Sequence, residues 1–327
     1  MNSVTPVDSR LDEVAALVVP RPANRWWVYQ SERFPIAGHG PLIAAFSFSA
    51  VSFSWLLRGN HGLPSSASIL TAFVTAFTLF LQLRIADEFK DFEEDSRCRP
   101  NRPVPRGLIK LRELGLIAVG CAVLQLLFAL WLAPSLLFLL FLTWAYLGLM
   151  TREFGVRNWI RERPITYLWS HMLIIPLADF YATACDWRGA GVPPPAGLFW
   201  FISVSFFNGV VLEVGRKIRT PADEEEGVRT YSGLWGRRIA VLTWLGALLA
   251  SAACAVMASA KIGFAKPVTG TLAFLLSLSG LFAWRFLSGP TGAGARLLEN
   301  FSGLWTLTMY LSLGAMPLLW QLIQGWR

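Results

Sequence analysis

The sequence predicts an all-α, polytopic membrane protein with nine transmembrane helices, and three observations support this fold class. Of its 327 residues, 54% are hydrophobic and only 15% are charged, whereas a soluble domain averages about 25% charged residues. Nine stretches approach the roughly 20 apolar residues that a helix needs to cross a bilayer. When the chain is threaded through a membrane along these stretches, most of its basic residues fall on one side.

The nine apolar stretches are joined by short connections. Pro134 separates the third stretch from the fourth with almost no loop, so these two should form a tight antiparallel hairpin. We expect residues 1–40 to form a cytoplasmic or interfacial N-terminal segment, with Trp26 and Trp27 at the lipid headgroups, and residues 41–327 to form one transmembrane domain. The stretches cover approximately residues 41–57, 68–86, 113–133, 135–151, 166–184, 197–214, 238–259, 267–287 and 297–323.

The Lys and Arg residues predict the orientation of the chain. With the N-terminus in the cytoplasm, 24 of the 29 basic residues lie on the cytoplasmic side, as the positive-inside rule requires. This predicts a multi-pass integral membrane protein, in the inner membrane if its source is a bacterium. The net charge of +8 then follows from loop topology, and no motif points to nucleic acid as a partner. The four cysteines lack CxxC spacing, so we expect neither disulfides nor a zinc site.

An acidic run followed by a basic run stands out after the second apolar stretch. If that helix continues, Asp87, Asp91 and Asp95 share one face, with Glu88 beside them. Closely spaced carboxylates suit Mg²⁺, which binds through a few carboxylates and substrate phosphates. The arginines that follow, among them Arg102, suit phosphate oxygens. The run therefore predicts a diphosphate site, and the alternative is a solvated charged loop.

A second long cytoplasmic loop follows the sixth stretch and has a similar layout. Glu213 ends an apolar helix, where an ionisable group usually lines a cavity. Arg216 and Lys217 follow it, and we expect both loops to face one cavity mouth if the helices duplicate a four-helix unit. The acidic cluster 223–226 is equally consistent with solvation and with a ligand role. Asp179 should lie near the outer surface in water, and His171 should be structural.

These motifs resemble those of the UbiA superfamily of intramembrane prenyltransferases. The run Asp87-Glu88-x-x-Asp91-x-x-x-Asp95 is similar to the family's first signature, Asn-Asp-x-x-Asp-x-x-x-Asp, and residues 102–107 are similar to its Arg-Pro-x-x-x-Gly. Tyr146 and Arg152 resemble the Tyr and the basic residue that close the family's fourth helix. Residues 227–230 fit the tail of the second signature, Asp-x-x-x-Asp before Gly-x-x-Thr, but Asp223 and Arg219 stand where the family has two aspartates.

The resemblance implies a UbiA-like bundle of two four-helix halves plus one helix, in contact with membrane lipid. It implies that Mg²⁺ helps ionise an isoprenyl diphosphate, whose prenyl group passes to a lipophilic acceptor, for example an aromatic one. Two alternatives stay open: a terpene cyclase of the same fold that needs no acceptor, and a transporter or structural membrane protein. The implied roles are catalysis by Asp91, Asp95 and Tyr146; substrate binding by Lys90, Arg102, Arg152, Arg216 and Lys217; and metal binding by Asp87, Glu88, Asp91, Asp95 and Glu213.

Overall fold

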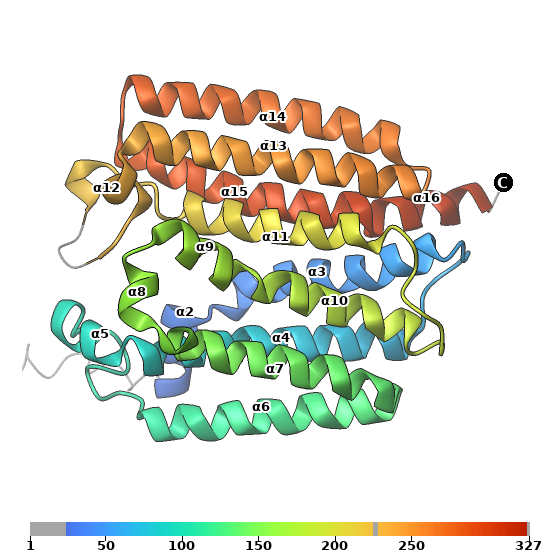
Figure 1. Cartoon of the computed structure of the whole chain (residues 1–327), viewed down its shortest axis with the longest axis horizontal. Coiled ribbons are helices and arrows are strands. Elements are labelled where there is room, and N and C mark those ends of the chain that lie inside the picture. Colours follow the sequence, from blue (N-terminus) through green and yellow to red (C-terminus); the bar gives the residue numbers. More distant parts are fainter. Residues whose placement is uncertain (1–23, 225–227, 326–327) are drawn as a thin grey trace, which may run out of the picture.

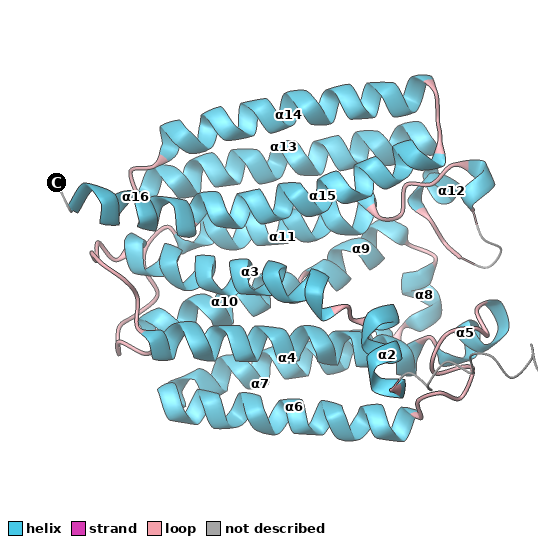
Figure 2. Cartoon of the chain, turned by 180° about the vertical axis from the view of Figure 1, so that it is seen from behind, coloured by secondary structure: helices cyan, strands magenta, loops and turns pink. Residues whose placement is uncertain are grey.

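The computed structural model of the chain describes residues 24–224 and 228–325. Residues 1–23 of the predicted N-terminal segment, Glu225 and Glu226 of the acidic cluster, and Gly227 of the second signature lie outside the described residues. The described part of the chain contains helices, turns and loops and no strand, so the predicted all-α fold class is confirmed (Figure 2).

Within the part of the chain that the structure describes, eight helices are long and apolar enough to cross a membrane. Their backbone groups are hydrogen-bonded within each helix, as the bilayer core requires. Large apolar side chains such as Phe138, Phe199 and Trp284 point outward and are about 70% exposed, which suits contact with lipid. The eight spans are α3 (Ile36–Leu57), α4 (Ser66–Lys90), α6 (Leu111–Leu132), α7 (Leu137–Thr151) with the 3-10 turn η1 (Pro134–Leu136) before it, α11 (Leu198–Gly215), α13 (Arg237–Lys261), α14 (Ala265–Ser288), and α15 (Gly292–Leu313) with its continuation α16 (Ala315–Gly325).

The fifth predicted span is the one that differs. It is divided into α9 (Pro164–Met172) and α10 (Ile174–Trp187), so the predicted number of nine spans is not exact, and eight single helices of sufficient length are found within the described residues. The physical reason is Pro176, which has no N–H to donate to the carbonyl of Met172 and whose ring clashes with that carbonyl. Figure 1 shows α9 and α10 following one another, with α11 above them and α7 below them in that view.

The long helices form two groups with α10 between them (Figure 1). α3, α4, α6 and α7 pack together, α11, α13, α14 and α15 form the second group, and α10 contacts α3, α4 and α7 on one side and α11 on the other. Close approach within the second group needs small residues. A Cβ on Gly215 of α11 would collide with Ser302 of α15, whose hydroxyl accepts a hydrogen bond of 2.8 Å from Trp244.

The short elements gather at one end of the bundle, which we call the loop end (Figure 1, left). α2 is anchored to the bundle there, because Tyr29 is buried in a small cluster with Ile85 and Leu114. Polar and charged side chains therefore concentrate where the spans end. The elements are α2 (Arg25–Arg33), α5 (Phe92–Cys98), η2 (Glu153–Gly155), α8 (Arg157–Arg161), η3 (Pro221–Asp223) and α12 (Tyr231–Trp235).

Candidate active site

The first acidic motif lies at the loop end, where α4 stops. α4 ends at Lys90, Asp91 caps it, and α5 begins at Phe92. The helix that would place the three aspartates on one face is therefore interrupted at Asp91, although the amide of Asp95 still donates a hydrogen bond of 2.8 Å to the carbonyl of Asp91. The first turn of α5 holds Glu93, Glu94 and Asp95, and acidic residues favour a helix N-terminus because of the helix dipole.

Two of the predicted metal ligands are paired with arginines. The carboxylate of Glu88 is buried and forms an ion pair with Arg33 of α2. Asp95 is also buried, with its Oδ2 2.5 Å from Nη1 of Arg102 and its Oδ1 3.5 Å from Nη1 of Arg99. The basic run therefore folds back over α5 and neutralises it, since a buried carboxylate needs a partner.

Asp87 and Asp91 are not held by strong ion pairs within the described residues. Asp87 is about half exposed and lies 3.7 Å from Nη1 of Arg84, a weak pair at this exposure. Asp91 forms no ion pair within residues 24–224 and 228–325. Burial raises the pKa of Asp91; the charge of Lys90 lowers it, and the nearby carboxylates raise it further. An incompletely compensated carboxylate of this kind favours an arriving cation.

Lys90 connects α4 with the segment that follows α7. Its Nζ donates a hydrogen bond of 2.9 Å to the hydroxyl of Tyr167 in α9, and lies 3.6 Å from Oε1 of Glu153 in η2. Arg161 of α8 approaches the same Oε1 at 3.4 Å through its Nε and reaches Glu94 of α5 at 3.7 Å. α4, α5, η2, α8 and α9 are thereby joined through charged side chains.

Tyr146 and Arg152 lie close by in sequence but have different surroundings. The hydroxyl of Tyr146 donates a hydrogen bond of 2.6 Å to the carbonyl of Ser170, and its ring packs edge-on against Phe154. Arg152 is exposed at the end of α7. Phe154 also contacts the ring of His171, which is buried and stacks on Tyr167.

The second loop carries its own compensated carboxylate. Glu213 is buried at the end of α11 and accepts a hydrogen bond of 2.7 Å from Nε of Arg216, while Nζ of Lys217 lies 2.8 Å away. Of the other acidic groups, Asp223 accepts from Thr220 at 2.5 Å and Glu224 from Thr230 at 2.6 Å. The described carboxylates of this loop are thus engaged within the protein.

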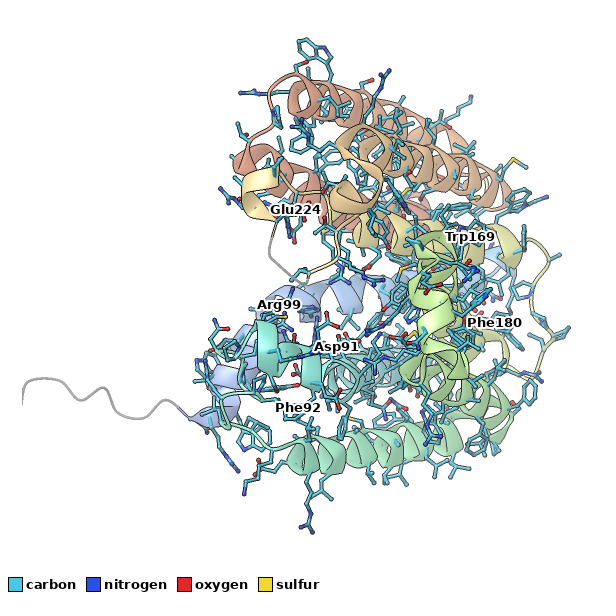
Figure 3. All side chains as sticks on the ribbon, turned by 60° about the vertical axis from the view of Figure 1, so that its left-hand side comes forward. Asp91, Phe92, Arg99, Trp169, Phe180 and Glu224 are labelled. Carbon is cyan, nitrogen blue, oxygen red and sulfur yellow. The ribbon has the colours of Figure 1, made fainter. Side chains whose placement is uncertain are left out.

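The two loops face each other at the loop end. Glu213 raises the pKa of Arg216, and Asp87 from the opposite loop adds to that rise. Arg229 donates a hydrogen bond of 2.7 Å to the carbonyl of Arg161 in α8. Figure 3 shows Asp91 and Arg99 on one side of this end and Glu224 on the other. Basic groups from both loops therefore lie around the end of α4.

The donor set fits a magnesium ion that is completed by substrate. Within the described parts of the chain, no three His, Cys, Asp or Glu side chains are grouped closely enough to hold a metal ion. Mg²⁺ commonly uses only one or two carboxylates together with substrate phosphates. Asp91 and Asp87 meet this need, whereas Asp95, Glu88 and Glu213 are held by arginine or lysine.

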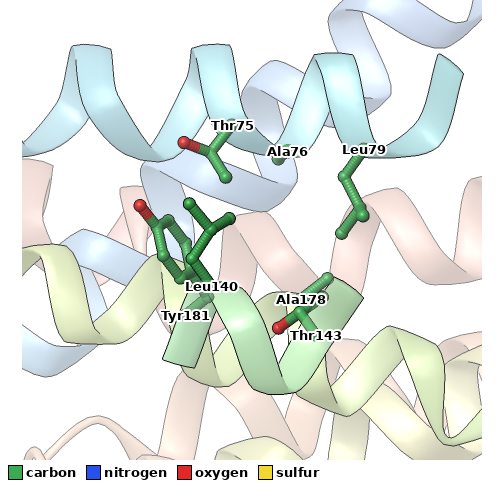
Figure 4. Close-up of a pocket in the computed structure, with 7 residues that line it drawn as sticks. All are labelled: Thr75, Ala76, Leu79, Leu140, Thr143, Ala178 and Tyr181. Atoms are coloured by element: carbon green, nitrogen blue, oxygen red, sulfur yellow. The ribbon is translucent and has the colours of Figure 1, made fainter. Parts of the chain in front are cut away.

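Behind the charged end, the bundle is apolar. A small cavity lies between α4, α7 and α10 (Figure 4), lined mainly by Leu79, Leu140, Ala178 and the ring of Tyr181. Asp179 of α10 is fully buried and accepts a hydrogen bond of 3.1 Å from Tyr310 of α15. The prediction that Asp179 lies in water is therefore wrong, because α10 is packed between the two helix groups.

Sequence reasoning missed Glu153, Tyr167 and Arg33. Glu153 lies two residues beyond the end of the apolar helix α7, so the argument that identified Glu213, an ionisable group near membrane depth, could also have identified Glu153. No signal along the chain pairs Arg33 with Glu88, since 54 residues separate them and only the docking of α2 brings them together.

Similar folds occur in solved structures at low sequence identity. A UbiA homologue from Aeropyrum pernix K1 has a TM-score of 0.64 and 15% identity over 88% of this chain and 98% of its own. A digeranylgeranylglyceryl phosphate synthase has a TM-score of 0.56 and 14% identity over 90% and 99%. A UbiA homologue from Archaeoglobus fulgidus, solved with DMAPP and Mg²⁺, has a TM-score of 0.53 and 12% identity over 88% and 99%. A search of curated protein sequences finds no match.

The fold and the site define a multi-pass membrane protein in which acidic and basic side chains cluster at the loop end of the helical bundle. The model of the UbiA prenyltransferase family matches residues 45–304, most of the chain. The chain therefore belongs to the UbiA prenyltransferase family, and the resemblance seen in its first signature is confirmed.

Proposed function

We propose that this protein ionises an isoprenyl diphosphate with the help of Mg²⁺ and transfers the prenyl group to a lipophilic acceptor within the membrane. The observation that carries the proposal is Asp91, a partly buried carboxylate without an ion pair among the described residues. It directly follows the end of α4, where Asp87 acts on the charge of Arg216 from the second loop. Structures of a relative with DMAPP or GPP and Mg²⁺ bound are consistent with this proposal.

The residues of this chain would divide the work as follows. Asp91 and Asp87 would hold Mg²⁺, which when bound supplies Lewis-acid stabilisation of the diphosphate. Lys90, Arg216 and Lys217 would provide preorganised positive charge for the leaving group. Arg102 would contribute after releasing Asp95, and Arg152 is exposed and free to turn toward a phosphate from the end of α7.

The apolar bundle would protect the reacting carbon. A prenyl cation is destroyed by water, and the helices behind the site offer hydrocarbon and aromatic side chains. Tyr146, held by Ser170, would present its ring toward positive charge developing on the prenyl chain. The excess of basic residues at the loop end supports a cytoplasmic location for this end and for the N-terminus.

The test is diphosphate release by purified protein in nanodiscs with Mg²⁺ and geranyl, farnesyl or geranylgeranyl diphosphate. We expect release that requires Mg²⁺, is abolished by Asp91→Asn, and rises when phenols or quinone precursors are added. Glu93→Gln is the matched control, because Glu93 is an exposed carboxylate on α5. Activity retained by Asp91→Asn would contradict the assignment, and a cyclised product from the diphosphate alone would establish a terpene cyclase instead.

A further inference from the structure

The segment after α7 carries two consecutive residues in a backbone conformation that costs energy. Glu153 has φ of 49° and Phe154 has φ of 55°, the left-handed region that residues with a Cβ rarely adopt. Neither is Asn or Asp, the types that tolerate it best. Strain of this kind persists where the surrounding structure enforces it, and it concentrates at functional sites.

The strain directs a carboxylate into the protein. Glu153 is only 1% exposed. Its Oε1 has two neighbours at long range, Arg161 at 3.4 Å and Lys90 at 3.6 Å, and its Oε2 has no hydrogen-bond partner among residues 24–224 and 228–325. An ionised oxygen without a donor is costly to bury. The two cations therefore approach only one of the two carboxylate oxygens, Oε1, and leave Oε2 without a partner among the described residues.

The surroundings of Glu153 connect it to the site proposed above. Lys90, its neighbour, precedes Asp91 and donates to Tyr167. On the other side, Phe154 packs against Tyr146 and His171. Oε2 thus belongs to a carboxylate that lies beside charged groups suited to a diphosphate and next to aromatic rings suited to a lipophilic molecule.

The chemistry of the group selects its ligand. A diphosphate would be repelled by a carboxylate, and no group of three metal-binding side chains includes Glu153 within residues 24–224 and 228–325. A neutral molecule that carries an O–H or N–H satisfies Oε2 directly, with a hydrogen bond to a charged acceptor. Arg161 is long and partly exposed, so its side chain can move aside to admit such a ligand.

We propose that Glu153 recognises the lipophilic acceptor through a hydrogen bond from that acceptor's hydroxyl or amino group to Oε2. This inference rests on the proposed function and narrows the acceptor to molecules with a hydrogen-bond donor beside an apolar body. The carboxylate binds and orients the donor group near the prenyl carbon.

The experiment compares 4-octylphenol with its methyl ether, 4-octylanisole, in which a methyl group replaces the hydroxyl hydrogen and removes the donor. Binding to purified protein in nanodiscs is followed by ligand-induced shifts in thermal unfolding. A second arm measures Mg²⁺-dependent binding of farnesyl thiolodiphosphate, which does not react. The variants are Glu153→Leu, Glu153→Gln and the matched control Glu162→Gln, which alters an exposed carboxylate of the same segment.

We expect the unaltered protein to bind the phenol about tenfold more tightly than the ether, the size of a hydrogen bond to a charged group. Glu153→Leu should abolish this preference and Glu153→Gln should reduce it, while both bind the thiolodiphosphate within about twofold of the unaltered protein; Glu162→Gln should change neither. Should Glu153→Leu fail to fold, Glu153→Gln decides.

Three results would overturn the proposal. The first is no preference for the phenol in the unaltered protein, and the second is an unchanged preference in the Glu153 variants. The third is a loss of thiolodiphosphate binding in Glu153→Leu and Glu153→Gln as large as their loss of phenol binding. The last would assign Glu153 to positioning Lys90. Failure of the unaltered protein to bind thiolodiphosphate with Mg²⁺ would instead refute the proposed function.

Discussion

The pairing of Arg33 with Glu88 leads to a prediction that separates a structural role for Glu88 from a metal-binding one. Both side chains are largely buried, Glu88 at 2% exposure. Arg33→Met leaves the carboxylate buried without compensation, and breaking a buried pair in this way costs about 3–5 kcal/mol. Replacing both residues by Met removes the carboxylate as well, so the double variant should lie within about 1–2 kcal/mol of the unaltered protein.

The assay is unfolding in mixed micelles by titration with sodium dodecyl sulfate, followed by tryptophan fluorescence. Arg25→Met is the matched control, because Arg25 lies on the same helix and pairs with Glu113 at 2.7 Å with both side chains partly exposed. An exposed pair contributes about 1 kcal/mol at most. If Arg33→Met costs no more than Arg25→Met, the buried pair does not anchor α2 and the reasoning is wrong.

Activity of the double variant completes this test. If Glu88 serves only to hold α2, the stable double variant should retain Mg²⁺-dependent diphosphate release within about threefold, small beside the hundredfold or greater loss typical of removing a catalytic electrostatic group. Loss of activity in a folded double variant would instead restore Glu88 as a metal ligand, as its place in the signature predicts.

Three further predictions concern the rest of the site and the bundle. Asp91→Asn should stabilise the metal-free protein at neutral pH. Burial raises the folded-state pKa of Asp91, so the stabilising contribution of Asp91 is full below its unfolded-state pKa and is lost as pH rises through its folded-state pKa. The free energy of unfolding measured from pH 3 to pH 8 should therefore show the gain in stability only at the higher pH. Tyr167→Phe removes the hydrogen bond to Lys90 and should lower diphosphate release about tenfold without loss of folding measured by circular dichroism; an unchanged rate would separate Lys90 from the leaving group. Gly314→Ala places a Cβ against the backbone of Ser49 and should destabilise the bundle by about 1–3 kcal/mol in the same micelle titration, and an unchanged midpoint would mean that α3 and α15 are not packed this closely.

The sequence alone determined the class of fold and the end of the bundle where the proposed site lies. Apolar length and the absence of charge define the spans because the bilayer imposes one length on every helix that crosses it. The first signature and the basic run after it identified the chemically distinctive segment. Placing ionisable side chains in a membrane costs free energy, so such residues usually have a function.

The tertiary structure decided the partners of those residues. Glu88, Asp95 and Glu213 have similar sequence contexts, yet each forms an ion pair with an arginine or lysine, whereas Asp91 forms none within the described residues. Pro176 accounts for the break in the fifth span, which the apolar pattern alone did not predict, and the burial of Asp179 follows only from the packing of α10 between two helix groups. The strained Glu153 likewise depends on how α7 meets α8. Local sequence composition determines where helices form, whereas charge pairing depends on which segments the folded bundle brings within a few ångströms of one another.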